Sequence, residues 1–201
     1  MSDDAILGVI LAGGKGERLG GRKALRPVAG APLITHVARV MPQPFAVVGD
    51  SEAAALLQVE SLNDPLGAAQ GPLAGVLAGL RWARALGADS VATAPCDAPL
   101  LPNDLFSRLR EYVTQTRAVA AYAVASDGAF PLCAVWRVHL LSELDAAMQG
   151  GAHPSVRSFF AQHGGATLTF ENADAFLNVN TPSDLERAEH LLKSSNTTAT
   201  T

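Results

Sequence analysis

The chain has 201 residues and a formal net charge of −4, and 48% of its residues are hydrophobic against 17% that are charged. This composition excludes a disordered chain, and the acidic balance excludes a nucleic-acid coat, which needs a broad basic surface. The length fits one domain or a large α/β unit with a substantial core.

The first predicted element is the apolar run from Ile6 to Ala12, which has no polar alternation and ends at glycine. Such a run is typical of a strand buried on both faces of a parallel sheet. Five glycines follow in residues 13–21, and five basic residues fall in residues 15–26. Exposed N–H groups and positive charge at the end of a strand predict an anion-binding loop, and the alternative is a solvated glycine-rich turn.

Two common phosphate motifs do not fit this loop. A Walker loop needs Ser or Thr after Gly-Lys, and the glycine spacing is one residue too long for the dinucleotide fingerprint. What remains is LAGG at residues 11–14 followed by Arg18 and Lys23, with Leu19 between them. This pattern resembles the nucleotidyltransferase signature LAGGxxxRMGxxK, with Leu19 in place of Met. In that superfamily the loop wraps a nucleotide triphosphate and the lysine reaches its phosphates.

The next elements alternate between helix and strand. Pro32 is suited to start a helix, residues 45–48 read as a short buried strand, and Ser51 is expected to cap a helix over residues 51–57. His36 is expected to be a packing or surface residue. This β-α-β alternation implies parallel strands joined by right-handed crossovers.

Residues 63–75 break the pattern with glycine and proline, and a strongly apolar helix follows as far as Gly87. Asp64 and the Gly71-Pro72 turn lie in the loop that enters this helix. A Gly-Pro turn before a helix is common on structural grounds alone. The segment also resembles the GPLAG element of the molybdenum cofactor guanylyltransferases, where the loop helps to enclose the guanine nucleotide.

Residues 90–95 predict another buried strand, and Asp97 lies just beyond its end. Open α/β sheets place ligands at the carboxyl ends of their strands, and Mg²⁺ bridges carboxylate and phosphate oxygens. Asp97 is therefore the candidate metal ligand, since it lies five residues too early to cap the helix after Pro102. The string PCDAPLL strongly resembles the PCDxPxL element of the same guanylyltransferases, and Cys96 is expected to be a packing residue.

The second half of the chain continues with predicted strands at 119–124, 131–136 and 166–171, and with predicted helices at 103–116, 139–148, 155–162 and from 182 onward. PLCAVW, at 131–136, resembles the family segment PLxALW. In the family a polar or basic residue commonly precedes that proline, and Phe130 in its place removes a possible substrate contact at this edge of the pocket.

Asn178 and Asn180 alternate on one face of an extended segment, so both amides can point into a cleft. Thr181 is suited to cap the last helix, with Asp184 in its first turn. The string NVNTP resembles the segment of the guanylyltransferase family in which the asparagines lie near the pterin.

The resemblance covers residues 6–192. It implies an α/β, Rossmann-like nucleotidyltransferase fold with a mostly parallel central sheet and helices on both faces. It also implies an enzyme that uses Mg²⁺ as its cofactor and transfers GMP from GTP to molybdopterin. Molybdenum-insertion and molybdoenzyme-delivery proteins are the protein partners that the resemblance implies. Arg18, Lys23 and Asp97 would be catalytic, Asp97 would bind the metal, and Asn178 and Asn180 would bind molybdopterin. The nucleotide would be bound by Leu11, Ala12, Gly13, Gly14, Lys23, Asp64, Gly71, Pro72 and Asp97.

We expect one domain over residues 1–193, with a nucleotide-binding half at about 1–115 and a molybdopterin-side half at 116–193. Residues 194–201, SSNTTATT, have no apolar anchor and predict a disordered tail.

The chain departs from the family pattern at two places. Family members often carry an acid where Arg22 stands, and many carry an asparagine near Gly49 and Asp50.

The sequence also leaves three alternative classes of protein. A molybdenum cofactor cytidylyltransferase shares the glycine loop, and a sugar-phosphate nucleotidyltransferase usually needs a longer chain. A non-catalytic nucleotide-binding adaptor would have no need for both Lys23 and Asp97.

Cys96 and Cys133 give neither a zinc spacing nor a disulfide framework, which is typical of a reducing compartment. The first residues are acidic at Asp3 and Asp4, so no secretory signal is expected. No apolar segment approaches the roughly 20 residues that span a membrane. We therefore expect a cytoplasmic protein with no membrane or nucleic-acid partner.

Overall fold

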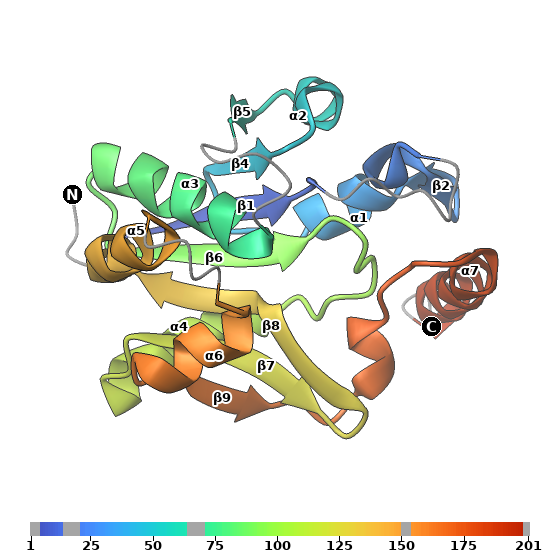
Figure 1. Cartoon of the computed structure of the whole chain (residues 1–201). Coiled ribbons are helices and arrows are strands. Elements are labelled where there is room, and N and C mark those ends of the chain that lie inside the picture. Colours follow the sequence, from blue (N-terminus) through green and yellow to red (C-terminus); the bar gives the residue numbers. More distant parts are fainter. Residues whose placement is uncertain (1–4, 14–20, 64–70, 150–153, 199–201) are drawn as a thin grey trace.

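The structure is a computed structural model that describes residues 5–13, 21–63, 71–149 and 154–198 (Figure 1). Its strands are β1 (Ile6–Leu11), β2 (Pro27–Val28), β3 (Ala31–Pro32), β4 (Phe45–Val48), β5 (Glu60–Leu62), β6 (Ser90–Pro95), β7 (Ala120–Ala125), β8 (Gly128–Arg137) and β9 (Ala166–Thr169). Its α-helices are α1 (Leu33–Ala38), α2 (Ser51–Leu57), α3 (Pro72–Ala85), α4 (Leu105–Thr116), α5 (Leu141–Gln149), α6 (Val156–Gln162) and α7 (Pro182–Thr198). Three 3-10 helices are described, at Lys23–Leu25, Val138–Leu140 and Ala173–Phe176.

The described strands form a seven-stranded sheet in the order β5-β4-β1-β6-β8-β7-β9, and β2 and β3 form a separate hairpin. β5, β4, β1 and β6 run parallel, β9 runs parallel to β7, and β8 is antiparallel to both of its neighbours. The prediction of a mostly parallel sheet is confirmed. Leu11 pairs with Val48 on one side and with Pro95 on the other, so three strands end at one place.

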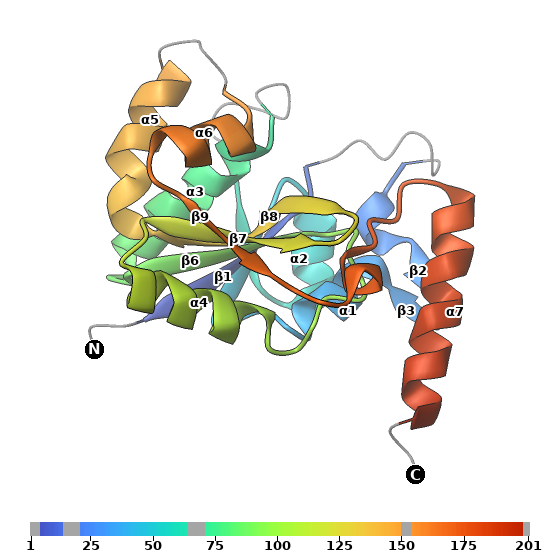
Figure 2. The ribbon, with the colours of Figure 1, turned by 90° about the horizontal axis from the view of Figure 1, so that it is seen from below.

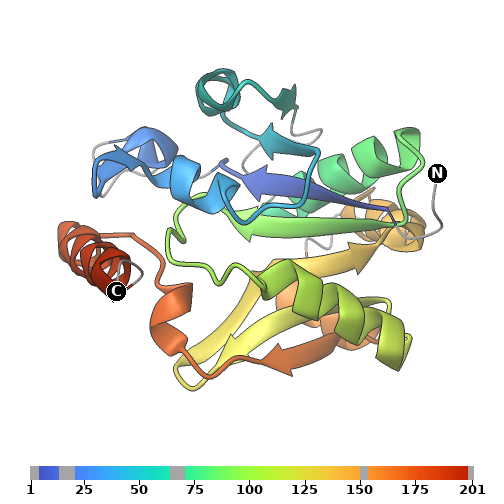
Figure 3. The same ribbon diagram turned by 180° about the vertical axis from the view of Figure 1, so that it is seen from behind.

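The alternation of side chains along β1 divides the core into two layers. Leu7 and Val9 pack with α3, α5 and α6, whereas Ile10 packs with α1 and α4 on the opposite face. Figure 3 shows α1 and α4 in front of the sheet, with α3 and α5 behind it. Val9 and Ile10 are both fully buried, as expected for a strand covered on both faces.

Two glycines of α3 face β1 and leave no room for a side chain. A Cβ added at Gly75 would come within 2.8 Å of Leu11 Cδ2, and one at Gly79 within 2.9 Å of Val9 Cγ2. Pro72 occupies the first helical position, after Gly71 at a φ of 76°. The fixed φ of proline suits that first position, so the sequence determines where this helix begins.

The C-terminal helix α7 returns to the N-terminal half of the chain. It lies beside the β2–β3 hairpin (Figure 2), where Ala188 packs with Val28, Leu33 and Val179. The helix extends to Thr198, so it overlaps the residues from 194 onward for which the sequence predicted a tail.

Helix starts are where the structure differs most from the sequence prediction. α2 is capped by Asp50, whose carboxylate accepts the N–H of Ala53 at 2.9 Å, and Ser51 is the first helical residue. Pro32 precedes α1 as its N-cap, because it still belongs to β3. Among the described residues, no helix has both the length and the hydropathy to cross a membrane.

Candidate functional site

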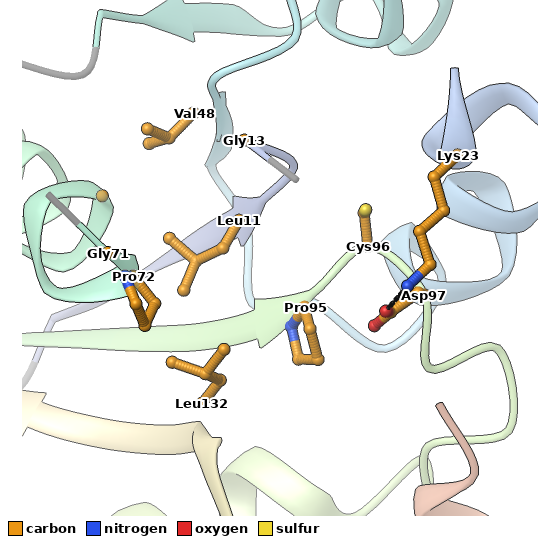
Figure 4. A pocket seen from close by; sticks show the side chains of 11 residues that line it. Leu11, Gly13, Lys23, Val48, Gly71, Pro72, Pro95, Cys96, Asp97 and Leu132 are labelled. Atoms are coloured by element: carbon orange, nitrogen blue, oxygen red, sulfur yellow. Dashed lines mark hydrogen bonds and ion pairs between the residues drawn. The ribbon is translucent and has the colours of Figure 1, made fainter. Parts of the chain in front are cut away.

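A cavity of about 290 Å³ opens where β1, β4 and β6 end (Figure 4). The described residues that line it come from strand ends, from the first turns of α3, from β8 and from the segments after β1 and β6. They are Leu11, Gly13, Lys23, Val48, Gly71, Pro72, Gly75, Pro95, Cys96, Asp97 and Leu132. The carboxyl edge of a parallel sheet is where open α/β folds bind their ligands.

One side of the cavity is apolar and the other carries charge. Figure 4 shows Leu11, Val48 and Leu132 together on one side of the cavity, and Lys23 and Asp97 on the other. An apolar slot next to a charged region suits a ligand with a planar base and an anionic chain.

The backbone after β1 is held tightly against the backbone after β4. Ala12 donates its N–H to the carbonyl of Val48 at 2.8 Å. A Cβ at Gly49 would lie 2.6 Å from Gly13 Cα, and Gly49 has a φ of 89°. Both the close approach and the left-handed backbone require glycine here.

Lys23 lies at the start of the 3-10 helix Lys23–Leu25, directly after Arg22. Arg22 has a backbone φ of 50°, which residues other than glycine rarely adopt. Its guanidinium forms an ion pair with Glu52 at the start of α2. The hydrogen bond to Glu52 and its negative charge raise the pKa of Arg22. This contact ties the backbone before Lys23 to α2.

The ammonium group of Lys23 joins three segments that are distant in sequence. It forms an ion pair with Asp97 (Figure 4) and donates to Oδ1 of Asn180 at 2.8 Å. The Lys23 and Asp97 side chains are 12% and 15% exposed, so both are shielded yet border the cavity. The predicted phosphate-loop lysine, the predicted metal ligand and one predicted molybdopterin ligand therefore form one cluster.

The position of Asp97 is set by backbone hydrogen bonds on both sides. Cys96 donates its N–H to the carbonyl of Leu11 at 3.1 Å, and Val179 donates to the carbonyl of Asp97 at 2.9 Å. Asp97 Oδ1 is buried and has no hydrogen-bond partner among the described residues.

A buried, unpartnered carboxylate oxygen is costly unless it gains a ligand, so Asp97 fits a divalent cation. The described residues contain no cluster of three or more acidic, histidine or cysteine side chains that could hold a metal. Magnesium needs no such cluster, since one or two carboxylates with phosphates and water complete its shell.

Cys96 and Cys133 are both buried and free. Burial, and then the negative charge of Asp97, raises the pKa of Cys96 to about 12. The same two causes raise the pKa of Cys133. Both thiols are protonated at neutral pH, which supports a packing role for Cys96.

The structure places many of the predicted site residues together. Leu11, Gly13, Lys23, Gly71, Pro72 and Asp97 line the cavity. Ala12 is buried. Asn178 contributes its carbonyl, which accepts a 3.4 Å hydrogen bond from the Asn180 amide. Gly14, Arg18 and Asp64 lie outside the described residues.

Sequence reasoning did not identify five of the cavity residues, namely Val48, Gly75, Pro95, Cys96 and Leu132. The signal for Val48 is its place at the end of a predicted buried strand, and Gly75 belongs to the GPLAG string. Leu132 reaches the cavity because β8 runs antiparallel next to β6. Phe130 stacks on Phe176 with ring centroids 4.6 Å apart, so it packs against the core in place of a polar contact.

These features define a class before any comparison. A mostly parallel sheet is typical of nucleotide-binding α/β proteins when a glycine-rich segment follows its first strand and charged side chains such as Lys23 and Asp97 border a cavity at its carboxyl edge. Residues 8–167 match the family model described as the MobA-like NTP transferase domain. The chain therefore belongs to the MobA-like NTP transferase family.

Two relatives with high coverage carry the same name. The chain is 43% identical over 194 residues to a molybdenum cofactor guanylyltransferase of Cereibacter sphaeroides, covering 94% of this chain and 97% of that protein. It is 36% identical over 193 residues to a protein of the same name from Rhodobacter capsulatus, with the same coverage of both chains.

Solved structures support the fold. The crystal structure of molybdopterin-guanine dinucleotide biosynthesis protein A from Archaeoglobus fulgidus superposes with a TM-score of 0.76 at 24% identity, covering 94% of this chain and 99% of that one. A CMP:2-keto-3-deoxy-manno-octonic acid synthetase complexed with CTP superposes with a TM-score of 0.70 at 13% identity, covering 96% and 99%. The predicted nucleotidyltransferase fold is confirmed.

Proposed function

We propose that this protein transfers GMP from GTP to molybdopterin, forming molybdopterin guanine dinucleotide and releasing pyrophosphate. The 43% identity to a molybdenum cofactor guanylyltransferase over nearly the whole of both chains supports the reaction and both substrates. The meeting of Lys23, Asp97 and Asn180 beside the cavity supports the location of the site, because three separate motifs supply one cluster.

The reaction forms one P–O bond and breaks another. A terminal phosphate oxygen of molybdopterin attacks the α-phosphorus of GTP, and the bond from that phosphorus to the bridging oxygen of the β-phosphate breaks. The electron pair leaves with pyrophosphate. The attacking phosphate is already anionic, so no strong base is needed. Catalysis then consists of in-line positioning and charge stabilisation.

The side chains on the charged side of the cavity fit this chemistry. Lys23 holds the phosphates and stabilises the charge that develops on the leaving pyrophosphate, with Arg18 as its partner in the loop. Because the Lys23 side chain is shielded from solvent, its ammonium attracts phosphate charge more strongly than it would in water. Asp97 would hold Mg²⁺, which supplies charge neutralisation at the phosphates when it is bound.

The base of GTP is assigned to the apolar side of the cavity, between Leu11, Val48 and Pro72. Gly71 and Asp64 lie in the loop that enters α3, and Asp64 is the proposed hydrogen-bonding partner of guanine or ribose. Asn178 and Asn180 are the proposed contacts to molybdopterin. Oδ1 of Asn180 accepts a 2.8 Å hydrogen bond from the Lys23 ammonium, which supports a molybdopterin site next to the phosphates of the nucleotide.

The proposed setting is the reducing cytoplasm, in agreement with two free buried thiols. We propose molybdenum-insertion and molybdoenzyme-delivery proteins as partners, since the product is a cofactor intermediate. We also propose that residues 1–193 form one domain, in which about 1–115 bind the nucleotide and 116–193 form the molybdopterin side.

The test is incubation of the protein with molybdopterin, Mg²⁺ and each of the four nucleoside triphosphates, followed by mass analysis of the product. Of the four nucleoside triphosphates, only GTP is expected to give a dinucleotide product. Calorimetry should show tighter binding of GTP than of CTP or ATP, because a site that hydrogen-bonds one base leaves its polar groups unpaired with another. CTP binding as tight as GTP would favour the cytosine dinucleotide instead, and nucleotide binding without transfer would favour an adaptor.

A further inference from the structure

Asp184, in the first turn of α7, is hydrogen-bonded to Asn180, whose amide oxygen accepts a hydrogen bond from Lys23. Its Oδ2 accepts the backbone N–H of Asn180 at 3.0 Å and that of Thr181 at 2.8 Å. In return, the Asp184 N–H donates to Oγ1 of Thr181 at 3.2 Å. The two bonds with Thr181 make a reciprocal helix cap, but the bond to Asn180 goes beyond it.

The hydrogen bond to Asn180 matters because the preceding residue is bonded to the Asp97 backbone and Asn180 itself is bonded to Lys23. Val179 is fully buried and donates its N–H to the carbonyl of Asp97 at 2.9 Å. The next residue, Asn180, is held by Asp184 and offers its amide oxygen to Lys23 at 2.8 Å. The extended segment is thus fixed to the Asp97 loop at one residue and to α7 at the following one.

We propose that Asp184 is a positioning residue for nucleotidyl transfer: its carboxylate holds the backbone of Asn180, and through Asn180 the ammonium of Lys23. This inference rests on the proposed function. Asp184 touches neither Lys23 nor the cavity in any described contact, so it acts through Asn180. Without it, Asn180 keeps the bond between its amide and Lys23 only at the cost of ordering its own backbone.

The charge of Asp184 fits this role. Burial favours the neutral acid, but hydrogen bonds from Asn180 and Thr181, helped by the charge of Lys23, leave the pKa of Asp184 below its ordinary value. The group is therefore a carboxylate at neutral pH. A carboxylate accepts backbone N–H groups more strongly than a neutral oxygen does.

The geometry is tested by amide hydrogen exchange, which requires no substrate. Asp184→Ala should speed the exchange of the Asn180 and Thr181 amides while the amides of β1 and β6 stay protected. Asp184→Asn, which keeps one neutral acceptor oxygen, should give a smaller change. Unchanged exchange at Asn180 in both variants would overturn the proposal.

The role in the reaction is tested by a double-mutant cycle on kcat/KM. Asp184→Ala should lower kcat/KM by between about 10-fold and about 100-fold, the usual range when a supporting contact or a small displacement is involved. Asn180→Ala should lower it at least as much, and the double variant no further than Asn180→Ala alone. If the two losses multiply, Asp184 acts independently of Asn180 and the proposal fails.

Thr181→Ala is the matched control, because it removes the other half of the cap and leaves the bond from Asp184 to Asn180. It should lower the melting temperature as a lost cap does, with kcat/KM within about twofold of wild type. An equal loss of kcat/KM in Thr181→Ala would mean that capping alone explains the effect. If the wild-type protein transfers no GMP, the proposed function itself fails and the positioning role with it.

Discussion

The ammonium group of Lys23 forms an ion pair with the carboxylate of Asp97, although the two residues lie 74 positions apart in the chain. The pair places a cation and an anion at the same edge of the cavity. Each group is assigned to a different species in the reaction, Lys23 to the phosphates and Asp97 to Mg²⁺. Binding of the substrate must therefore rearrange this pair, and the first three predictions follow from that requirement.

Lys23→Ala should leave a folded protein and slow turnover by about 100-fold or more, as the loss of one charge-stabilising group commonly does. The variant also leaves the Asp97 carboxylate without its cation, so we expect a loss of about 1–3 kcal/mol in the free energy of unfolding. Steady-state kinetics and urea unfolding measure the two effects separately. Arg81→Ala breaks the remote 2.8 Å ion pair with Asp145 and should leave turnover unchanged. A Lys23→Ala protein that melts but whose folded fraction turns over normally would make the lysine structural.

Asp97→Asn should raise the Mg²⁺ concentration needed for turnover and lower the maximum rate, because the neutral amide is a weaker ligand for a hard cation. Shape and fold should persist, since the amide is isosteric with the carboxylate. Mn²⁺ should recover part of the loss. Activity is measured against metal concentration for wild type and variant. Superimposable curves would mean that the metal is held elsewhere.

Lys23 should also compete with the metal for Asp97 when no nucleotide is bound. Its ammonium pairs with Oδ2 of that carboxylate, so its positive charge lies beside the site proposed for a divalent cation and opposes binding there. We expect Lys23→Ala to bind Mn²⁺ more tightly than wild type in the absence of nucleotide, as measured by the electron paramagnetic resonance signal of free Mn²⁺. Asp97→Asn should bind it more weakly. Equal or weaker Mn²⁺ binding by Lys23→Ala would show that the ion pair does not block the site.

Gly75→Ala and Gly79→Ala form a matched pair on α3. Both methyl groups would press on β1, at 2.8 Å from Leu11 and 2.9 Å from Val9, so each should cost about 1–3 kcal/mol by overpacking, offset in part by the helix propensity of alanine. Leu11 and Gly75 line the cavity, whereas Val9 and Gly79 do not. GTP affinity in calorimetry should therefore fall about 10-fold in Gly75→Ala alone. Equal affinity losses in both variants would place the effect in α3 packing and not in the cavity.

The two buried thiols should make stability depend on alkaline pH. The ordinary pKa of 9.0 rises to about 12 for Cys96 in the folded protein, so the folded state keeps a proton that the unfolded chain loses. This contribution is complete below pH 9 and is lost as the pH rises from about 9 to about 12, at up to about 1.4 kcal/mol per pH unit. The free energy of unfolding, measured with urea between pH 8 and pH 10.5, should fall less steeply with pH in Cys96→Ala than in wild type. Parallel curves would mean that Cys96 ionises freely in the folded protein.

Local patterns were sufficient for much of the fold. The apolar run at residues 6–12, the strand at 90–95 and the helix after Gly71-Pro72 appear where the sequence predicts them. Each depends on near neighbours: a buried strand on its uninterrupted apolar side chains, and the helix on the fixed φ of Pro72. Helix caps were less predictable, because Asp50 and Ser51 are adjacent and both are good caps.

The sequence by itself predicted Lys23, Asp97 and Asn180 as site residues, because the glycine loop, Asp97 and the NVNTP string each lie next to a strand or helix that local sequence patterns determine. Only the tertiary structure decided that Lys23, Asp97 and Asn180 meet, across separations of 74 and 157 residues. It also decided that Leu132 reaches the cavity and that Phe130 packs on Phe176. These contacts depend on the order of strands in the sheet and on the return of α7 to the β2–β3 hairpin. Burial of apolar surface between distant segments sets that arrangement, and no local periodicity encodes it.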